Sequence, residues 1–554
     1  MCTGPEQAEA TDDKAPMFSR LGAVRVWRGL IGFAVLAVLV AAPLAGWPRV
    51  VRLPAILVPA LALALLVTRP WRWQESDLRA LDQQPSSRLV WSSAFIAALS
   101  LFWYILTRFQ SGEINAVDFT VYFDRPCFQT VQGRPLFVEV SDTPGFSNRS
   151  EFADHAYWAM LPICSLYAIV PGPYWLHAIS ALAIVAGAVY VLRIMQQLGA
   201  GGALACASAL AFILNDNTAR TLNYGFHPEV LYAWLVPWMI DAGLRRAPRS
   251  FLVATIACVL VKEDACLPIF AVAVALALHR FPSMTWADRR LFLILPNALA
   301  LANLAVYYGY VSPMLTGRSG PTYAHFWANY GETPLLALVG MMSHPGQVLA
   351  SALTSGISRV AMPHLFLPLV GWKWALGVVP TILIYGASAN QQVRDFGIYY
   401  SIVLVPFLVI AASSGALTVT RRLINNGGHA QLAAASIVLL GSLLVGSWHR
   451  GYSLRPWKAS IAALPGALST FSSEPIVLVQ SGLFPHAGYD TRFKLLTPET
   501  LSDPRHAGVP VILAERNGAY PFKKEDLAGL RALPPIRALR GGLIAVRLPS
   551  APGR

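Results

Sequence analysis

The residues best suited to chemistry form a charged triplet, Lys262-Glu263-Asp264, between two apolar runs. Phe251–Val261 precedes the triplet and Ala265–Leu278 follows it. Charges next to lipid are costly and rare, so they mark a functional site by default. Lys262 is predicted to bind a substrate phosphate, and Glu263 and Asp264 to bind a divalent cation, Mg²⁺ or Mn²⁺, or a sugar hydroxyl. The alternative without function is a charged turn that caps two helix ends.

Two carboxylates, Asp118 and Asp124, follow the third predicted membrane span. Their spacing places them on different faces of a helix but on the same side of a strand. Paired carboxylates can take a proton from an acceptor hydroxyl or hold a divalent cation. Both are therefore predicted to be catalytic, with Asp118 as the base. Two solvated loop acids are the alternative.

A third polar group, the segment Asn223–Glu229, opens another predicted span. Pro228 and the acid after it are ordinary features of a helix start. That explanation does not account for His227, which sits among aromatic residues. His227 and Glu229 are predicted to bind substrate.

Two further residues, His155 and Arg394, are predicted to bind an anionic substrate. Both are expected on the outer side of the membrane, against the charge bias that places basic residues inside. A solvated or snorkelling side chain is the competing explanation for each of them.

The composition is that of a membrane protein. Of the 554 residues, 55% are hydrophobic and only 13% are charged, whereas soluble proteins carry about 25% charged residues. The net charge of +14 comes without a Lys/Arg-rich tract, which excludes a typical nucleic-acid-binding protein. The six cysteines contain no CxxC pair, so buried, unpaired thiols are expected rather than disulfides.

Apolar runs predict a mainly helical bundle with roughly 12–13 membrane spans. Arginine clusters between the runs place alternate loops on the cytoplasmic side. The short run Tyr157–Val170 is expected to lie on the outer surface without crossing. The predicted spans are Gly29–Gly46, Leu53–Val67, Leu89–Thr107, Tyr174–Ile194, Ala203–Leu214, Pro228–Leu244, Phe251–Val261, Ala265–His279, Leu291–Val311, His364–Val370 with Trp374–Ala387, Ile398–Val419 and Leu432–Trp448.

This pattern predicts three regions. Residues 1–28 form a disordered cytoplasmic segment, residues 29–449 the membrane domain, and residues 450–554 a soluble α/β domain on the outer side. Two long outer loops cover residues 108–156 and 312–358. In the tail, strands are expected at the apolar runs Pro475–Gly482, Val509–Arg516 and Gly542–Leu548.

The layout resembles the GT-C class of membrane glycosyltransferases. That class has about a dozen spans, a long first outer loop with an Asp base, and often a soluble C-terminal domain outside. The resemblance implies a polyprenyl-phosphate sugar donor and puts Asp118 in the place of the loop base. The run from His155 to Gly172, followed by Tyr174–Ile194, looks like the short surface helix and next span of the class.

A more specific resemblance is to a family of bacterial membrane proteins, domain of unknown function 2079. The family has an F-D-x-x-x-x-D-Q-like loop, an F-H-P-E helix start, a K-E-D triplet and an H-x-x-x-R element. The matching segments are Val117–Arg125, Phe226–Glu229, Lys262–Asp264 and Ser481–Arg492. Val117 and Arg125 depart from the family pattern, as does the extra N-terminal hairpin.

Together these features favour a glycosyltransferase of the bacterial inner membrane, with membrane lipid and a polyprenyl-phosphate sugar as partners. A lipid or solute transporter or flippase is one alternative, because charges within membranes also line transport paths. A scaffold that binds a partner through its outer tail is another. The chain contains no GxxxxGK[ST] or HExxH motif, so neither the phosphate loop of an ATP-driven motor nor this metalloprotease signature is present.

Overall fold

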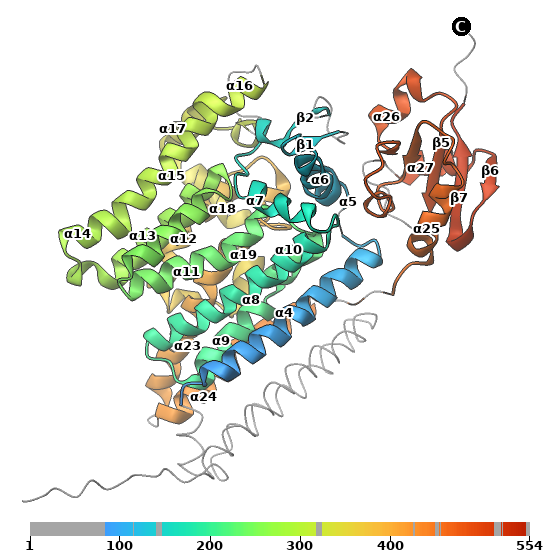
Figure 1. The fold of residues 1–554 in the computed structure, drawn as a ribbon. Helices are drawn as coiled ribbons and strands as arrows, with labels where there is room; N and C mark the ends of the chain where they lie inside the picture. Colours follow the sequence, from blue (N-terminus) through green and yellow to red (C-terminus); the bar gives the residue numbers. More distant parts are fainter. Residues whose placement is uncertain are drawn as a thin grey trace, which may run out of the picture.

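The computed structural model describes residues 83–549 except 115, 140–146, 317–323, 425–426, 449–451, 453, 455, 515–521 and 523. The predicted N-terminal segment and the first two predicted spans lie outside these residues. Figure 1 shows two parts: a bundle of helices from α4 to α24, and a small α/β domain from α25 onward that stands beside one end of the bundle.

The bundle is that of a polytopic membrane protein. Within the described residues, four helical segments are long and apolar enough to cross a membrane: Ser87–Gln110, Tyr174–Gln197, Glu263–Ser283 and Trp286–Thr316. A fifth is possible if Leu335–Ser343 and Pro345–Thr354, bent by 95°, form one span. The other helices of the bundle that are eight or more residues long are α9 (Gly202–Leu214), α10 (Asp216–Tyr224), α11 (Tyr232–Leu244), α12 (Pro248–Val259), α21 (Val379–Gly386), α23 (Val405–Leu423) and α24 (Gly427–Trp448).

Helix α8 (Tyr174–Gln197) packs against α4 (Ser87–Gln110), α9 and α11. Small residues allow these backbones to approach closely, as in other membrane bundles. Gly187 is the clearest case, because a Cβ there would lie 2.0 Å from the carbonyl oxygen of Ala233 in α11. Any side chain at position 187 would therefore push α8 and α11 apart.

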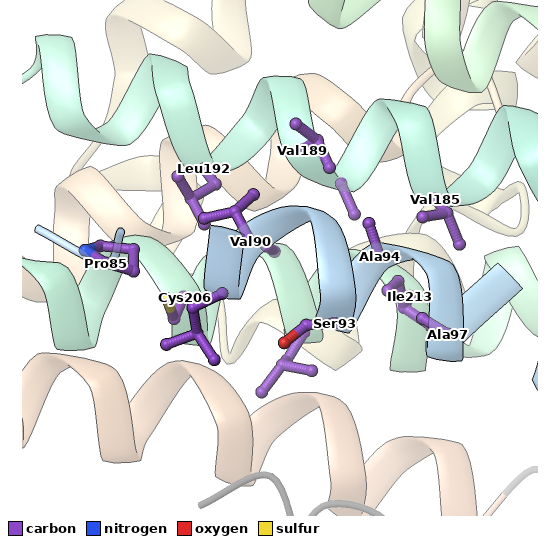
Figure 2. A pocket seen from close by; sticks show the side chains of 14 residues that line it. Pro85, Val90, Ser93, Ala94, Ala97, Val185, Val189, Leu192, Cys206 and Ile213 are labelled. Atoms are coloured by element: carbon purple, nitrogen blue, oxygen red, sulfur yellow. The ribbon is translucent and has the colours of Figure 1, made fainter. Parts of the chain in front are cut away.

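The arginine-rich loops meet at one end of the bundle. Arg246 donates to the carbonyl oxygen of Ser283 at 2.6 Å, and Arg280 donates to that of Leu244 at 2.8 Å. Near this end an apolar pocket of about 690 Å³, including its open mouth, lies between α4, α8 and α9 (Figure 2). The α4 residues in its lining belong to the first half of that helix, whereas Asp118 follows the far end of α4.

The first outer loop begins with one continuous helical segment. It runs through α5 (Ala116–Phe119), a π-helical turn at Thr120–Asp124 and α6 (Arg125–Val131). Two short antiparallel strands follow, β1 (Phe137–Val138) and β2 (Arg149–Ser150). Asp118 and Asp124 therefore lie on a helix, where their spacing separates their side chains.

The segment Tyr157–Val170, predicted to be a surface helix, contains two short helical pieces, α7 (Met160–Ser165) and the 3₁₀ turn Leu166–Ala168. A disulfide joins Cys127 of α6 to Cys164 of α7. The expectation of unpaired thiols was therefore wrong for this pair. The two cysteines are 37 residues apart in runs without a cysteine motif, and only the folding of the loop over the surface helix brings them together.

The tail is an α/β domain, as predicted. Its five-stranded sheet has the order β4-β3-β5-β7-β6. Strand β3 is parallel to both of its neighbours, β4 and β5. Strand β7 is antiparallel to both of its neighbours, β5 and β6. The elements are α25 (Ala459–Ser469), β3 (Val477–Val479), β4 (Phe493–Leu495), α26 (Pro498–Ser502), β5 (Pro510–Ala514), α27 (Lys524–Arg531), β6 (Pro535–Ala538) and β7 (Leu543–Arg547). The three strands expected from apolar runs correspond to β3, β5 and β7.

Candidate functional site

The charged triplet forms a turn between α12 and α13 (Cys266–Arg280), and its side chains point into the protein. Lys262 donates from Nζ to Oε1 of Glu229 at 2.6 Å, and both side chains are 7% exposed. The other oxygen of Glu229 pairs with Nδ1 of His227. The H-P-E segment and the triplet, distant in sequence, thus share one buried ion cluster.

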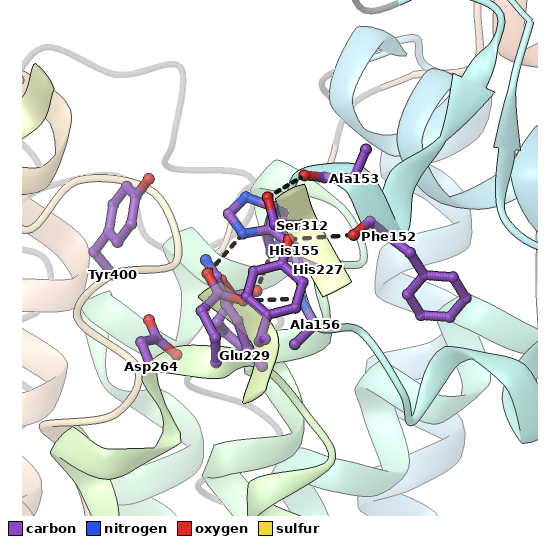
Figure 3. Close-up of polar contacts among 12 residues, drawn as sticks. Phe152, Ala153, His155, Ala156, His227, Glu229, Asp264, Ser312 and Tyr400 are labelled. Atoms are coloured by element: carbon purple, nitrogen blue, oxygen red, sulfur yellow. Dashed lines mark hydrogen bonds and ion pairs between the residues drawn. The ribbon is translucent and has the colours of Figure 1, made fainter. Parts of the chain in front are cut away.

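Glu263 ties the same cluster to the end of the first outer loop. Its Oε1 lies 2.8 Å from Nδ1 of His155, and its Oε2 accepts the backbone N–H of Ala156 at 2.9 Å. Figure 3 shows His155, His227, Glu229 and Asp264 gathered in one place. His155 is therefore held by the triplet.

The third member of the triplet, Asp264, is only partly buried. Its two oxygens accept hydrogen bonds from the hydroxyls of Tyr232 at 3.2 Å and Tyr385 at 3.3 Å. These bonds are longer than typical O–H···O distances. Of the three triplet side chains, Asp264 thus has the loosest protein contacts and is best placed to accept a hydroxyl from a ligand.

Glu151 is a site residue that the sequence did not reveal. The residue is buried, with 5% of its surface exposed. Burial raises its pKa well above the usual value, and the neighbouring carboxylates of Asp154 and Asp118 raise it further, against Arg149 and Lys262. The one signal available in the sequence was its position just before His155.

Asp118 belongs to the same electrostatic environment. It lies half-buried in α5 and interacts with Glu151 and with Tyr400. The charge of Lys262 acts on the same two side chains, Glu151 and Tyr400, so Asp118 and the triplet share one electrostatic environment. The loop is held there by hydrogen bonds from Ser312 to the carbonyl oxygen of Ala153 at 3.0 Å and from Tyr307 to that of Phe152 at 3.3 Å.

Tyrosines line this cluster, and sequence analysis missed them. The ring of His227 stacks on Tyr399 with centroids 3.6 Å apart, and Tyr399 donates to the hydroxyl of Tyr400 at 3.2 Å. Lys262 lies 5.8 Å from the ring centre of Tyr157. The pair Tyr399-Tyr400 precedes α23, where the sequence predicted the start of a span; an aromatic pair at a membrane surface is too common a pattern to mark a site.

Two predicted site residues have their contacts elsewhere. Oδ1 of Asp124 accepts the hydroxyls of Tyr167 at 2.8 Å and Tyr489 at 2.7 Å. Burial raises the pKa of Asp124 to about 6, although these hydroxyls and Arg125 lower it. Arg394 lies 3.9 Å from Asp395. A catalytic role for Asp124 and a substrate-binding role for Arg394 stay predictions. The contacts of these two residues do not support either role.

The predicted metal role of Glu263 and Asp264 fits the geometry poorly. Both oxygens of Glu263 are already bonded to His155 and Ala156. In the part of the chain that the structure describes, no group of three or more His, Cys, Asp or Glu side chains is arranged to hold a metal ion.

The cluster as a whole is acidic. Against Lys262 it has five carboxyl groups: Asp118, Glu151, Glu229, Glu263 and Asp264. Two histidines add positive charge only when protonated. Such a site can accept a proton from a hydroxyl, hydrogen-bond to a polyhydroxylated ring and offer tyrosine faces for stacking.

The comparisons with known proteins gave one family and several structural likenesses. The family described as "Predicted membrane protein (DUF2079)" matches residues 108–450. By sequence, no curated protein matches the chain.

Among solved structures, the chain is similar to ArnT from Cupriavidus metallidurans bound to undecaprenyl phosphate. The identity is 12% and the TM-score 0.49, over 83% of this chain and 98% of that one. It is also similar to the arabinofuranosyltransferase AftD from Mycobacteria, at 14% identity and a TM-score of 0.43, over 85% of this chain and 40% of that one. Both TM-scores lie below 0.5, so nothing about the chemistry of this chain follows from them.

Proposed function

We propose that this chain, which belongs to the DUF2079 family of predicted membrane proteins, is a glycosyltransferase that moves a sugar from a polyprenyl-phosphate donor to an acceptor hydroxyl. The observation that carries the proposal is the buried ion cluster that joins Lys262 to Glu229 and His227, and Glu263 to His155. The charges of Asp118 and Lys262 both act on the buried carboxyl of Glu151. A carboxylate suited to take a proton and a cation suited to hold a phosphate thus belong to one tyrosine-lined, acidic cluster.

Asp118 is the proposed base. In the transfer, the bond from the anomeric carbon of the sugar to the phosphate oxygen breaks, and a bond from that carbon to the acceptor oxygen forms. The acceptor proton passes to Asp118, and polyprenyl phosphate leaves. Because burial favours the protonated form of Glu151, Asp118 can hold the negative charge of this pair, as coupled carboxylates commonly do.

Lys262 is the proposed partner of the leaving phosphate. A lysine ammonium has three N–H donors, and one of them is used by Glu229. The remaining two can bind phosphate oxygens while Glu229 keeps the side chain in place. Charge stabilisation on the leaving group is the largest contribution that a protein can make to such a transfer.

The sugar is proposed to lie between Asp264 and the tyrosine side chains. Asp264 is partly exposed and weakly bonded by Tyr232 and Tyr385, so a sugar hydroxyl can replace either contact. Tyr400, next to the stacked pair of His227 and Tyr399, offers a ring face. His155 and His227 complete the wall and supply donors when protonated.

The site is proposed to face the outer side of the bacterial inner membrane, together with residues 450–554. The Cys127–Cys164 disulfide lies in the segment that carries Asp118, and disulfides persist in oxidising compartments. The loops with arginine clusters meet at the opposite end of the bundle, as expected for a cytoplasmic face.

The test is a turnover assay on the purified full chain in lipid. The wild-type protein is offered a panel of polyprenyl-phosphate sugars, and release of polyprenyl phosphate is measured. Asp118→Asn should lower the rate by a factor on the order of 100 or more. Asp503→Asn, on the tail surface, is the matched control. Movement of intact donor across the membrane without cleavage would instead support the transporter alternative.

A further inference from the structure

The tail domain shares a hydrophobic core with the first outer loop. Val117 and Val121, one helical turn apart on the segment that bears Asp118, pack in one buried cluster with Leu464, Leu483 and Phe484 of the tail. Burying apolar side chains of both parts in one core stabilises their association. The loop and the tail are therefore docked, although more than 300 residues separate them in sequence.

The contact is made by the loop between β3 and β4. Tyr489 donates to Asp124 at 2.7 Å and stacks on Phe128 with ring centres 4.3 Å apart. Arg125 donates to the carbonyl oxygen of Gly488 at 2.8 Å and lies 4.3 Å from the ring centre of Phe484. These polar contacts fix the orientation of the tail relative to the first outer loop, which the apolar core alone would not determine.

This loop stands at a special position of the sheet. β4 and β5 lie on opposite sides of β3, so the carboxyl end of β3 is the point where the strand order reverses. In α/β sheets, that edge is the usual place for a ligand. In this chain, the first outer loop of the membrane domain occupies it.

The other face of the same helical segment belongs to the candidate site. The ring of Phe123 lies 4.7 Å from that of His227, and Asp118 interacts with Glu151 and Tyr400. The π-helical turn at Thr120–Asp124 adds a residue to the helical turn, a device often found at functional sites. The segment from Ala116 to Val131 thus lies between the tail and the charge cluster.

We propose that the tail domain is a positioning element of the site, with Tyr489 and Arg125 as positioning residues. Docked through them, the tail fixes the helical segment that presents Asp118 and Phe123 to the charge cluster. Asp124 serves here as the acceptor for Tyr489. The role of Asp118 rests on the proposed function, whereas the docking and its effect on the triplet do not.

The test is Tyr489→Phe in the full-length protein in lipid nanodiscs. This change removes one hydroxyl but keeps the ring that stacks on Phe128. Deuterium uptake is measured in peptides covering residues 116–131 and 262–266. Loss of a hydrogen bond to a charged acceptor should speed exchange in both regions by a factor on the order of ten. Tyr174→Phe, at an exposed tyrosine whose hydroxyl has no hydrogen-bond partner among the described residues, should change neither.

A second variant and a kinetic readout separate positioning from simple loss of stability. Arg125→Lys keeps the charge but loses the geometry of the bond to Gly488, and it should loosen the same two regions. With a donor that is turned over, both variants should lower kcat and leave the donor KM unchanged, since neither side chain touches the donor. If no donor is turned over, the proposed function fails and the exchange data alone decide the positioning role. Unchanged exchange at 116–131, or faster exchange that does not reach 262–266, would overturn it.

Discussion

Replacing Asp124 by Asn should change how the stability of the protein depends on pH. Asp124 is 2% exposed, and both tyrosine hydroxyls donate to the same oxygen. Burial raises its pKa from 3.8 to about 6. Because the pKa is higher in the folded state, the stability contributed by Asp124 is fully present below its unfolded pKa. It is lost as the pH rises through about 6.

The size of the effect follows from the shift. One pKa unit corresponds to about 1.36 kcal/mol, so a rise from 3.8 to about 6 corresponds to about 3 kcal/mol in full. About 2 kcal/mol of this is lost between roughly pH 4.5 and pH 7.5. Asn keeps an oxygen acceptor for the tyrosines but does not ionise, so the variant should not show this loss.

The assay compares the free energy of unfolding of wild type and Asp124→Asn at both pH values. The difference between them should move by about 2 kcal/mol in favour of the variant at the higher pH. Asp503→Asn is the control, because its Arg505 partner lowers the pKa of Asp503 to about 2. Asp503 is therefore ionised in the folded state at both pH values and largely so in the unfolded state, and its substitution should leave the pH dependence nearly unchanged. The buried-carboxylate reasoning would be refuted if the difference in unfolding free energy between wild type and Asp124→Asn did not change with pH. It would also be refuted if this difference favoured the wild type more at the higher pH.

Three further predictions concern other contacts. Lys262→Met leaves Glu229 buried with only His227 as its ion-pair partner. The substitution should lower the unfolding free energy by about 3–5 kcal/mol, measured by denaturant titration. An unchanged unfolding midpoint would contradict the ion cluster. Reduction of the Cys127–Cys164 disulfide, which spans 37 residues, should lower the unfolding free energy by about 4 kcal/mol in the same titration. An unfolding free energy that does not change with reductant would contradict the presence of the bond. In equilibrium binding assays, Tyr399→Phe should retain sugar binding, whereas Tyr399→Ala should weaken it several-fold, because only Ala loses the stack on His227. An equal loss of sugar affinity in both variants would contradict the role of stacking.

The sequence predicted what strong local patterns determine. The membrane class followed from composition, and the turn at Lys262–Asp264 followed from charges that interrupt apolar runs. β3, β5 and β7 were found because long apolar runs mark buried strands. β4 and β6 were missed, since both lie at edges of the sheet and a charged residue, Lys494 or Arg537, interrupts each apolar run.

The site was predictable only in part, because its contacts join distant segments. Charged residues in apolar surroundings pointed to His155, His227 and the triplet, and the structure brings these together. No local pattern indicated that Asp124 would face the tail, because that depends on where Tyr489 lies. Glu151 looked like any loop acid until folding buried it.

Asp118 and Lys262 are proposed to act on one donor at one site. The most direct measurement is the rate of polyprenyl-phosphate release by the full-length protein in lipid, with wild type, Asp118→Asn and Lys262→Arg compared at saturating donor. We expect turnover by the wild type and a lower kcat in both variants, by a factor on the order of 100 or more in Asp118→Asn. The kcat falls in Lys262→Arg because Lys262 is proposed to stabilise the charge that develops on the leaving phosphate. Turnover that is unaffected by Asp118→Asn would contradict this proposal, as would a folded wild-type protein that neither binds nor cleaves any polyprenyl-phosphate sugar.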